Sequence, residues 1–200
     1  MKKGCVLTLG IMLGLVAGAI GVVYFHFKNE FDPIYHGKRI YTWADQAIWD
    51  DDPEARQEAV RVCFEALEDL EGEPRTQFIM QFVHPKRGNQ EKTRLPKELL
   101  PFLIRAMKIE DRSGYAIMAL RQLDATDIVP TLIALLRNEE SVSTRVQVVA
   151  ILRTFAFEGR LGPAEEQARA ALREALQDAD PQVQKSAGEA LNWIEAPKKR

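Results

Sequence analysis

The sequence predicts an all-α protein, with one membrane-spanning helix followed by an α-α solenoid of about four helical hairpins. Three observations support this fold class. An uncharged apolar run opens the chain, and from residue 41 onward a short helix-turn-helix pattern recurs. In addition, no segment alternates apolar and polar residues between glycine-bearing turns, so we expect no strand. Two hundred residues suit one compact unit rather than two large domains.

Residues 4–25 form the apolar run and carry no charged side chain. A helix of this length, at about 1.5 Å per residue, spans the roughly 30 Å hydrocarbon core of a bilayer. A cleaved signal peptide is the rival interpretation, because Ala17, Gly18 and Ala19 supply small residues for a cleavage site. The run is longer than a typical signal core, however, and cleavage there would leave an apolar new terminus. We therefore expect residues 1–28 to be an uncleaved anchor.

The anchor also suggests an orientation and a contact. Lys2 and Lys3 precede the apolar run, which is typical of a signal anchor, so we expect the chain in the cell membrane with its C-terminal domain outside the cytoplasm. Gly10, Gly14 and Gly18 recur every four residues and leave one helix face nearly bare. Such a face favours self-association, although glycine is frequent in membrane helices generally, and both interpretations stay open.

After the anchor, residues 29–40 combine turn formers with mixed charge, which predicts a short irregular stalk. The repeat domain is expected over residues 41–195, with an irregular insertion at about 71–94, and residues 196–200 form a basic tail. First helices of the helical hairpins are predicted over residues 42–49, 96–108, 127–138 and 163–177.

The second helices begin with a shared local signal. The string Asp50-Asp51-Asp52-Pro53 precedes one of them, and Asp178-Ala179-Asp180-Pro181 precedes another. The aspartate before each proline can cap the helix, and proline at the first helical position loses no needed hydrogen bond. Four second helices can be aligned on common reference positions, which are Arg56, Ser113, Arg145 and Gln184. The interval from Arg56 to Ser113 is longer than the other two, which implies an insertion or a degenerate extra unit between Leu70 and Leu95.

These strings resemble HEAT repeats, as do Pro130 and the aliphatic residues that follow it in the predicted helix at 127–138. The resemblance covers about 150 residues. Ser113 and Gln184 depart from the arginine of the pattern. The resemblance implies a stacked helical solenoid that binds another protein. Some HEAT-like proteins are enzymes that attach bilin pigments to cysteines or excise alkylated bases from DNA, and this resemblance is at the level of fold alone.

Catalytic motifs are missing from the sequence. The three histidines are scattered, the two cysteines are far apart, and neither a P-loop nor a hydrolase elbow is present. We therefore expect no catalytic residue, no cofactor and no metal site, and we interpret Asp50, Asp51 and Asp52 as a capped turn. A formal net charge of −2 argues against a nucleic-acid partner.

Charge is unevenly distributed along the chain. Residues 45–73 hold eleven acidic and two basic side chains, whereas residues 74–108 hold two acidic and eight basic ones. Complementary binding surfaces and ordinary solvated helix faces both account for this pattern. The loop at 83–94 is irregular and basic, so its cationic side chains are the candidate partner-binding residues. They are Lys86, Arg87, Lys92 and Arg94.

The three tryptophans lie near the two ends of the predicted array. Trp43 and Trp49 flank the first helix, and Trp193 lies on the last. Packing is the ordinary role for such residues at terminal repeats, and a binding hot spot is the alternative. The function expected from the sequence is a membrane-anchored, non-enzymatic protein-protein interaction scaffold whose partner is a protein.

Overall fold

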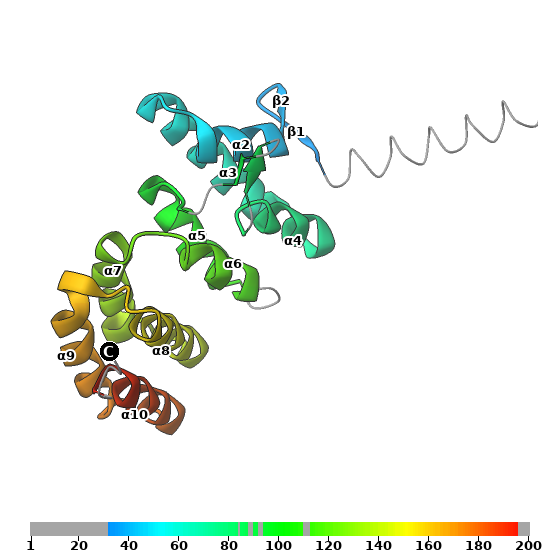
Figure 1. Cartoon of the computed structure of the whole chain (residues 1–200). Helices are drawn as coiled ribbons and strands as arrows, with labels where there is room; N and C mark the ends of the chain where they lie inside the picture. Colours follow the sequence, from blue (N-terminus) through cyan, green and yellow to red (C-terminus); the bar gives the residue numbers. More distant parts are fainter. Residues whose placement is uncertain (1–31, 84, 88–89, 92–93, 110–112, 196–200) are drawn as a thin grey trace, which may run out of the picture.

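The computed structural model of the chain describes residues 32–83, 85–87, 90–91, 94–109 and 113–195 (Figure 1). The predicted anchor at 4–25, its glycine face, the basic tail and Lys92 lie outside these residues. Within the described ranges, no helix combines the length and the apolar character needed to span a membrane.

The described residues form an all-α helical repeat domain with nine α-helices. Two short 3-10 turns, η1 (Lys97–Leu99) and η3 (Gly162–Ala164), lead into α5 and α9. The helices are α2 (Ile40–Trp49), α3 (Pro53–Asp69), α4 (Gly72–Met80), α5 (Leu100–Met107), α6 (Ser113–Leu120), α7 (Ala125–Asn138), α8 (Val142–Phe157), α9 (Glu165–Ala175) and α10 (Pro181–Glu195).

The helices pair and then stack in a row (Figure 1). Helix α5 packs on α6, α7 on α8, and α9 on α10. Between successive helical hairpins, α7 lies against α9 and α8 against α10. One hydrophobic core runs through the row, from Ile40 to Ile194. The predicted solenoid is therefore confirmed for this part of the chain, because each apolar helix face is covered by the next helical hairpin.

The stretch at 71–94, for which an irregular insertion and a degenerate extra unit were both open, contains helix α4, so it is not irregular throughout and agrees with the second interpretation. Phe78 and Phe82 are fully buried, and both rings contact Phe102 of α5, at centroid distances of 5.8 and 4.8 Å. Helix α4 lies against α6, while α3 lies against η1 and α5. Helices α3 and α4 thus continue the two layers of the array, and α2 packs on α3 as an additional helix at its N-terminal end.

Two small β-hairpins contradict the prediction of no strand. Strand β1 (Ile34–Tyr35) pairs with β2 (Lys38–Arg39), and β3 (Lys86–Arg87) pairs with β4 (Gln90–Glu91), both antiparallel. His36 and Gly37 form the first turn at φ values of 47° and 77°, the left-handed backbone that two-residue β-hairpin turns require. Each strand has only two residues, too short for an alternating pattern to appear in the sequence.

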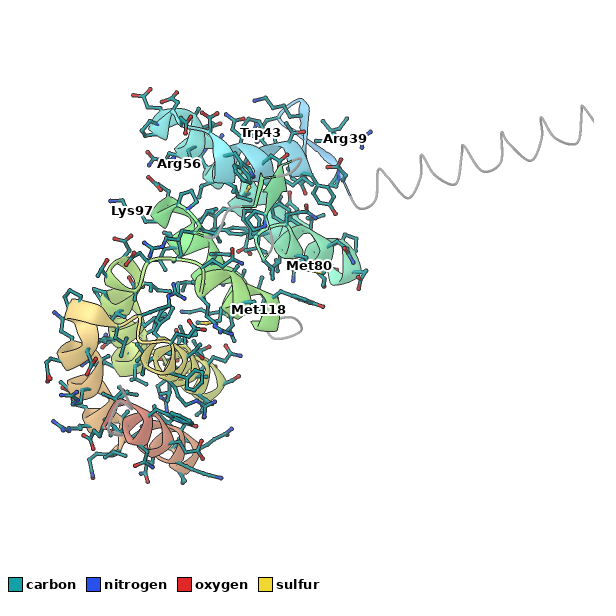
Figure 2. The ribbon with its side chains drawn as sticks, in the orientation of Figure 1. Arg39, Trp43, Arg56, Met80, Lys97 and Met118 are labelled. Atoms are coloured by element: carbon teal, nitrogen blue, oxygen red, sulfur yellow. The ribbon has the colours of Figure 1, made fainter. Side chains whose placement is uncertain are left out.

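The first β-hairpin changes the interpretation of the predicted stalk. Trp43 lies on α2, next to the first β-hairpin (Figure 2). It is buried and donates a hydrogen bond from Nε1 to the carbonyl oxygen of Tyr35, at 2.7 Å. Arg39 donates to the carbonyl oxygen of Asp32, also at 2.7 Å. Residues 32–39 are therefore hydrogen-bonded to α2, so this part of the stalk predicted at 29–40 has regular structure. Trp43 has the packing role expected from the sequence.

The predicted helix caps are present in both D-x-D-P strings. Asp52 accepts a hydrogen bond from the backbone N–H of Glu54 at 3.1 Å, and Asp180 accepts one from Gln182 at 2.8 Å. Each side chain satisfies an N–H group that the first helical turn leaves free. The aspartate before each proline therefore acts as a cap, as the sequence predicts.

Three of the four reference positions of the repeats make the same hydrogen bond. Arg56 donates to the carbonyl oxygen of Asp50, Arg145 to that of Glu139, and Gln184 to that of Asp178, at 2.9, 2.8 and 2.7 Å. In each case the acceptor lies six residues earlier in the chain, so one contact recurs in three units. The side chain of Ser113 lies outside the description.

Candidate functional site

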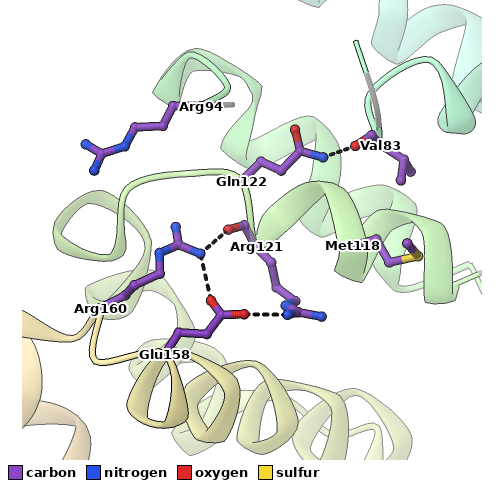
Figure 3. A pocket seen from close by; sticks show the side chains of 7 residues that line it. All are labelled: Val83, Arg94, Met118, Arg121, Gln122, Glu158 and Arg160. Atoms are coloured by element: carbon purple, nitrogen blue, oxygen red, sulfur yellow. Dashed lines mark hydrogen bonds and ion pairs between the residues drawn. The ribbon is translucent and has the colours of Figure 1, made fainter. Parts of the chain in front are cut away.

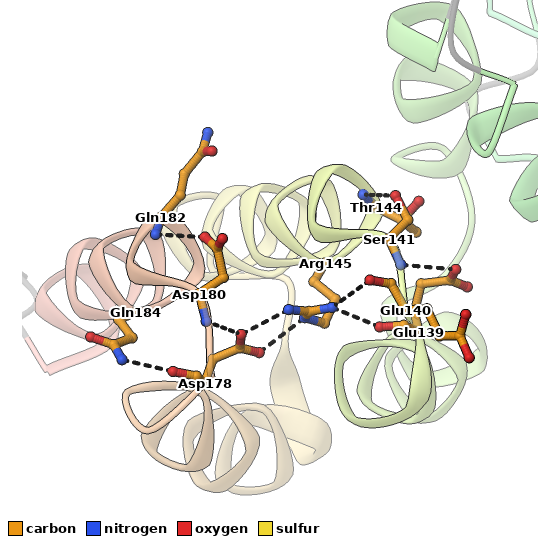
Figure 4. Close-up of polar contacts among 9 residues, drawn as sticks. All are labelled: Glu139, Glu140, Ser141, Thr144, Arg145, Asp178, Asp180, Gln182 and Gln184. Atoms are coloured by element: carbon orange, nitrogen blue, oxygen red, sulfur yellow. Dashed lines mark hydrogen bonds and ion pairs between the residues drawn. The ribbon is translucent and has the colours of Figure 1, made fainter.

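A clamp formed by Arg145 and Asp178 joins the last two helical hairpins (Figure 4). The guanidinium makes two bonds to the carboxylate, at 2.8 and 2.9 Å, and both side chains are only 12% exposed. The bonds from Arg145 hold the pKa of Asp178 below its usual range, although burial acts in the opposite direction. Because the same guanidinium also binds the Glu139 carbonyl, its donors are already engaged and its role is structural.

Further ion pairs link units along the array at a nearly constant interval. They join residues 36 or 37 positions apart, which is about one repeat. The pairs are Glu68–Arg105, Arg121–Glu158, Arg137–Glu174 and Arg153–Glu189.

Two pairs connect the acidic stretch at 45–73 to the basic stretch at 74–108. These are Glu68–Arg105 and Arg56–Glu98, with the latter at 3.1 Å. Only Glu68–Arg105 joins an acidic residue of the first stretch to a basic residue of the second, so it alone of the two balances part of the charge polarisation within the chain.

A cavity of about 380 Å³ lies where the ends of α6 and α8 meet the segment after α4 (Figure 3). It opens to solvent, and polar side chains form much of its wall. Its lining residues are Val83, Arg94, Met118, Arg121, Gln122, Glu158 and Arg160. We refer to it as the α6–α8 pocket.

Arg160 fixes one side of the α6–α8 pocket. It follows α8 and donates to the carbonyl oxygens of Arg121 and Leu123, at 2.6 and 2.8 Å. These carbonyls follow the last turn of α6, where helix geometry leaves acceptors without a partner. Arg160 therefore ties the end of α6 to the next helical hairpin.

Glu158 lies between two arginines in the same pocket. It accepts hydrogen bonds from Arg121 at 2.6 Å and from Arg160 at 3.1 Å (Figure 3). Burial acts to raise the pKa of Glu158, but the bonds from Arg121 and Arg160 outweigh it, and the pKa lies below its usual range. Glu158 is therefore ionised at neutral pH and is poorly suited to act as a general acid.

Arg94 is the predicted contact residue that the structure places in the pocket. Its Nη1 atom donates to Asp124 at 2.9 Å, yet 73% of its side chain is exposed. Lys86 and Arg87 have described backbones in β3, and Lys92 lies outside the described residues. Sequence reasoning missed Arg121 and Arg160, because no motif links residues from separate helical hairpins that meet only after stacking.

Two other open hollows are present in the described part of the chain. One, of about 630 Å³, adjoins α2 and is lined by Lys38 and by acidic residues that include Asp45 and Asp51. The other, of about 620 Å³, lies over α3 and α5 and has an apolar floor that includes Phe64 and Leu100. The residues that line these two hollows include no serine, cysteine or histidine.

No cluster of potential metal ligands occurs among the described residues. Cys63 is fully buried, and burial raises the pKa of its thiol, so the reactive thiolate is disfavoured.

Trp193, on the last helix, is 51% exposed, and its ring contacts that of Phe157 at a centroid distance of 5.1 Å.

Comparison with known families finds a similarity in the C-terminal part of the array. The family model for HEAT repeats matches residues 96–192. Over this stretch the chain is similar to HEAT repeats. HEAT repeats commonly serve as protein-interaction scaffolds, because stacked helical hairpins present an extended surface. Neither the curated proteins nor the solved structures gave a match to this chain.

Proposed function

We propose that the protein is a membrane-tethered, non-enzymatic scaffold that holds another protein on its HEAT-repeat array. One observation carries the non-enzymatic part of this proposal. Within the described residues, the only buried polar side chains are Thr76 and Thr144, and the only buried ionisable group is the thiol of Cys63. An active site typically needs titratable groups with strongly perturbed environments, and many of the described carboxylates, such as Asp52 and Asp178, instead serve in caps and ion pairs.

The shape of the pockets supports the same proposal against the enzyme alternative. A bilin-attaching or base-excising protein needs a recess that encloses its substrate and brings reactive groups to it. The three hollows described above open to solvent, and Cys63 lines none of them. An open polar surface suits a protein segment better than an enclosed substrate.

Tethering is the second part of the proposal. The uncharged run at 4–25 is long enough to cross a bilayer, and the repeat domain follows it after a short connection. An anchored array with its C-terminal domain outside the cytoplasm would hold its partner near the cell membrane at a high effective concentration. Self-association through Gly10, Gly14 and Gly18 would add a second copy of the array beside the first.

A cross-linking experiment in cells tests the scaffold function. Met118 lines the α6–α8 pocket and is 44% exposed, so a photoreactive amino acid can replace it in the full-length chain. We expect illumination to yield one discrete protein adduct from this position. The control position is Glu166 on α9, whose side chain is 79% exposed and lies outside the pocket. Equal adducts from both positions, or none from either, would count against the proposal.

A fractionation experiment tests the tether separately. The full-length chain should stay in the membrane fraction after alkaline carbonate extraction. This treatment disrupts electrostatic contacts with the membrane surface and does not release a helix that spans the bilayer. A variant without residues 4–25 should appear in the supernatant. Recovery of the full-length chain in the supernatant would refute the tether and leave the scaffold function to be judged by cross-linking.

A further inference from the structure

We propose that the α6–α8 pocket binds carboxylate side chains in an acidic segment of the partner protein. The inference rests on the proposed scaffold function and specifies the chemistry of what the scaffold holds. Three guanidinium groups line the pocket, from Arg94, Arg121 and Arg160, and they come from three separate parts of the array. A guanidinium recognises a carboxylate through two parallel N–H bonds, which is the closest geometric match among common side-chain pairs.

The arginines differ in how many donors they retain. Arg160 binds two backbone carbonyls and Glu158, so its donors serve to stabilise the fold. Arg94 and Arg121 each have one carboxylate partner and are 73% and 40% exposed. Since a guanidinium carries five N–H donors, both side chains keep donors without a partner, and one of them, the Nε of Arg121, is buried. They are the groups available to an incoming carboxylate.

The charge of the pocket also favours an anionic ligand. Three arginines face two nearby carboxylates, Glu158 in the lining and Asp124 beside Arg94, which leaves an excess of one positive charge. Hydrogen bonds from Thr126 hold the pKa of Asp124 low, and Arg94 and Arg160 add to this, so the carboxylate stays ionised. The excess is therefore present at neutral pH, and a carboxylate from the partner would balance it.

The size and wall of the pocket indicate a peptide rather than a nucleic acid. About 380 Å³ accommodates a few side chains, and the wall includes exposed Met118 beside the arginines. An acidic residue next to an apolar one would satisfy both parts of this wall. A phosphate backbone would instead need a row of cations, and the chain as a whole carries a net charge of −2.

The test is a selection of random peptides displayed on phage against the immobilised full-length chain in detergent. We expect the recovered sequences to be enriched in Asp and Glu next to apolar residues. A fluorescein-labelled peptide made from the enriched sequence should bind R94Q and R121Q at least about tenfold more weakly, as measured by fluorescence anisotropy. Arg94 is largely exposed, so R94Q should retain the fold.

Matched controls separate the pocket from general charge. Arg137 forms the same kind of ion pair, with Glu174, away from the pocket, so R137Q should bind within about twofold of the unchanged chain. R121K keeps the charge without the planar fork and should also bind more weakly.

Several outcomes would overturn the pocket proposal. These are recovery of peptides without acidic residues, no enrichment at all, equal weakening by R137Q, or equal binding of a peptide with Gln in place of Glu. Tighter binding of a single-stranded oligonucleotide would assign the pocket to nucleic acid instead. The scaffold function fails separately, when cross-linking in cells gives equal adducts from Met118 and Glu166 or none from either. If R94Q and R121Q leave the yield of the cross-linked adduct unchanged, the scaffold function stands and the pocket proposal is wrong.

Discussion

Arg145 shows how one side chain can hold two helical hairpins together. It binds Asp178 of the following unit through two nitrogen atoms and the Glu139 carbonyl of its own unit through a third bond. Both charged partners are mostly shielded from water, which limits screening by salt. The contact therefore differs from the exposed pairs of the same array, such as Arg137–Glu174.

We expect Arg145→Ala to lower the free energy of unfolding by about 2–3 kcal/mol, because it leaves Asp178 and a backbone carbonyl without their charged donor. Urea denaturation followed by circular dichroism measures the change. Arg137→Ala removes a pair that is half exposed on both sides, and it should change stability much less. Equal losses in the two variants would show that shielding does not distinguish the pairs.

The Arg145–Asp178 clamp also predicts a dependence on pH. The bonds from Arg145 hold the pKa of Asp178 below that of an unfolded chain, which is about 3.9. The stability from this group is therefore present above pH 4 and is lost as the pH falls through the folded-state pKa. Other carboxylates shift in the same direction, so the comparison is between two chains. Stability should fall less between pH 5 and about pH 2.5 in Arg145→Ala than in the unchanged chain, as measured by urea midpoints.

Residue roles that depend on neighbours in sequence were predictable, and those that depend on stacking were not. The caps at Asp52 and Asp180 follow from an aspartate placed just before a proline and a helix. The bond from each reference position to a carbonyl six residues earlier is equally local. Arg160, in contrast, meets Arg121 across 39 residues, and nothing in the local sequence signals that meeting.

At the scale of elements, helix α4 is the instructive case. Its nine residues contain a glycine, a proline and only three large apolar side chains, all at its end, so no helical periodicity appears. The stretch nevertheless folds as a helix because Phe78 and Phe82 enter a cluster with Phe102 and cover α6 from one side. Tertiary packing, rather than local propensity, determines this element.

We expect Phe78→Ala to destabilise the fold by about 3–5 kcal/mol, since the ring is fully buried and its removal leaves a cavity among aromatic neighbours. Thermal unfolding monitored by circular dichroism measures the loss. Met80→Ala is the matched control on the same helix, where the side chain is 38% exposed, and it should cost under about 1 kcal/mol. A mild effect of Phe78→Ala would mean that α4 contributes little to the core.

At the scale of the whole molecule, the helical hairpins are not equally coupled. Helices α7 to α10 pack closely on one another, whereas backbone contact between the α5–α6 and α7–α8 units is sparser. Polar side chains bridge this junction instead, with Arg160 at the end of α6 and a Lys108–Glu139 ion pair at the ends of α5 and α7. In a linear array, stability spreads only through such neighbour interfaces. The α6–α8 pocket lies at the same junction, so a bound segment would strengthen it.

The junction predicts where the array separates first. Arg160→Ala removes two bonds to backbone carbonyls and one to Glu158, and we expect it to weaken the junction by about 1.5–3 kcal/mol. Hydrogen–deuterium exchange should then rise in peptides from α5 and α6, while peptides from α7 to α10 keep their protection, because the interfaces among those helices are intact. Arg153→Ala, which removes a pair within the C-terminal units, should leave α5 and α6 unchanged. Uniform acceleration along the whole array in Arg160→Ala would mean that the units unfold as one body and that the junction has no separate stability.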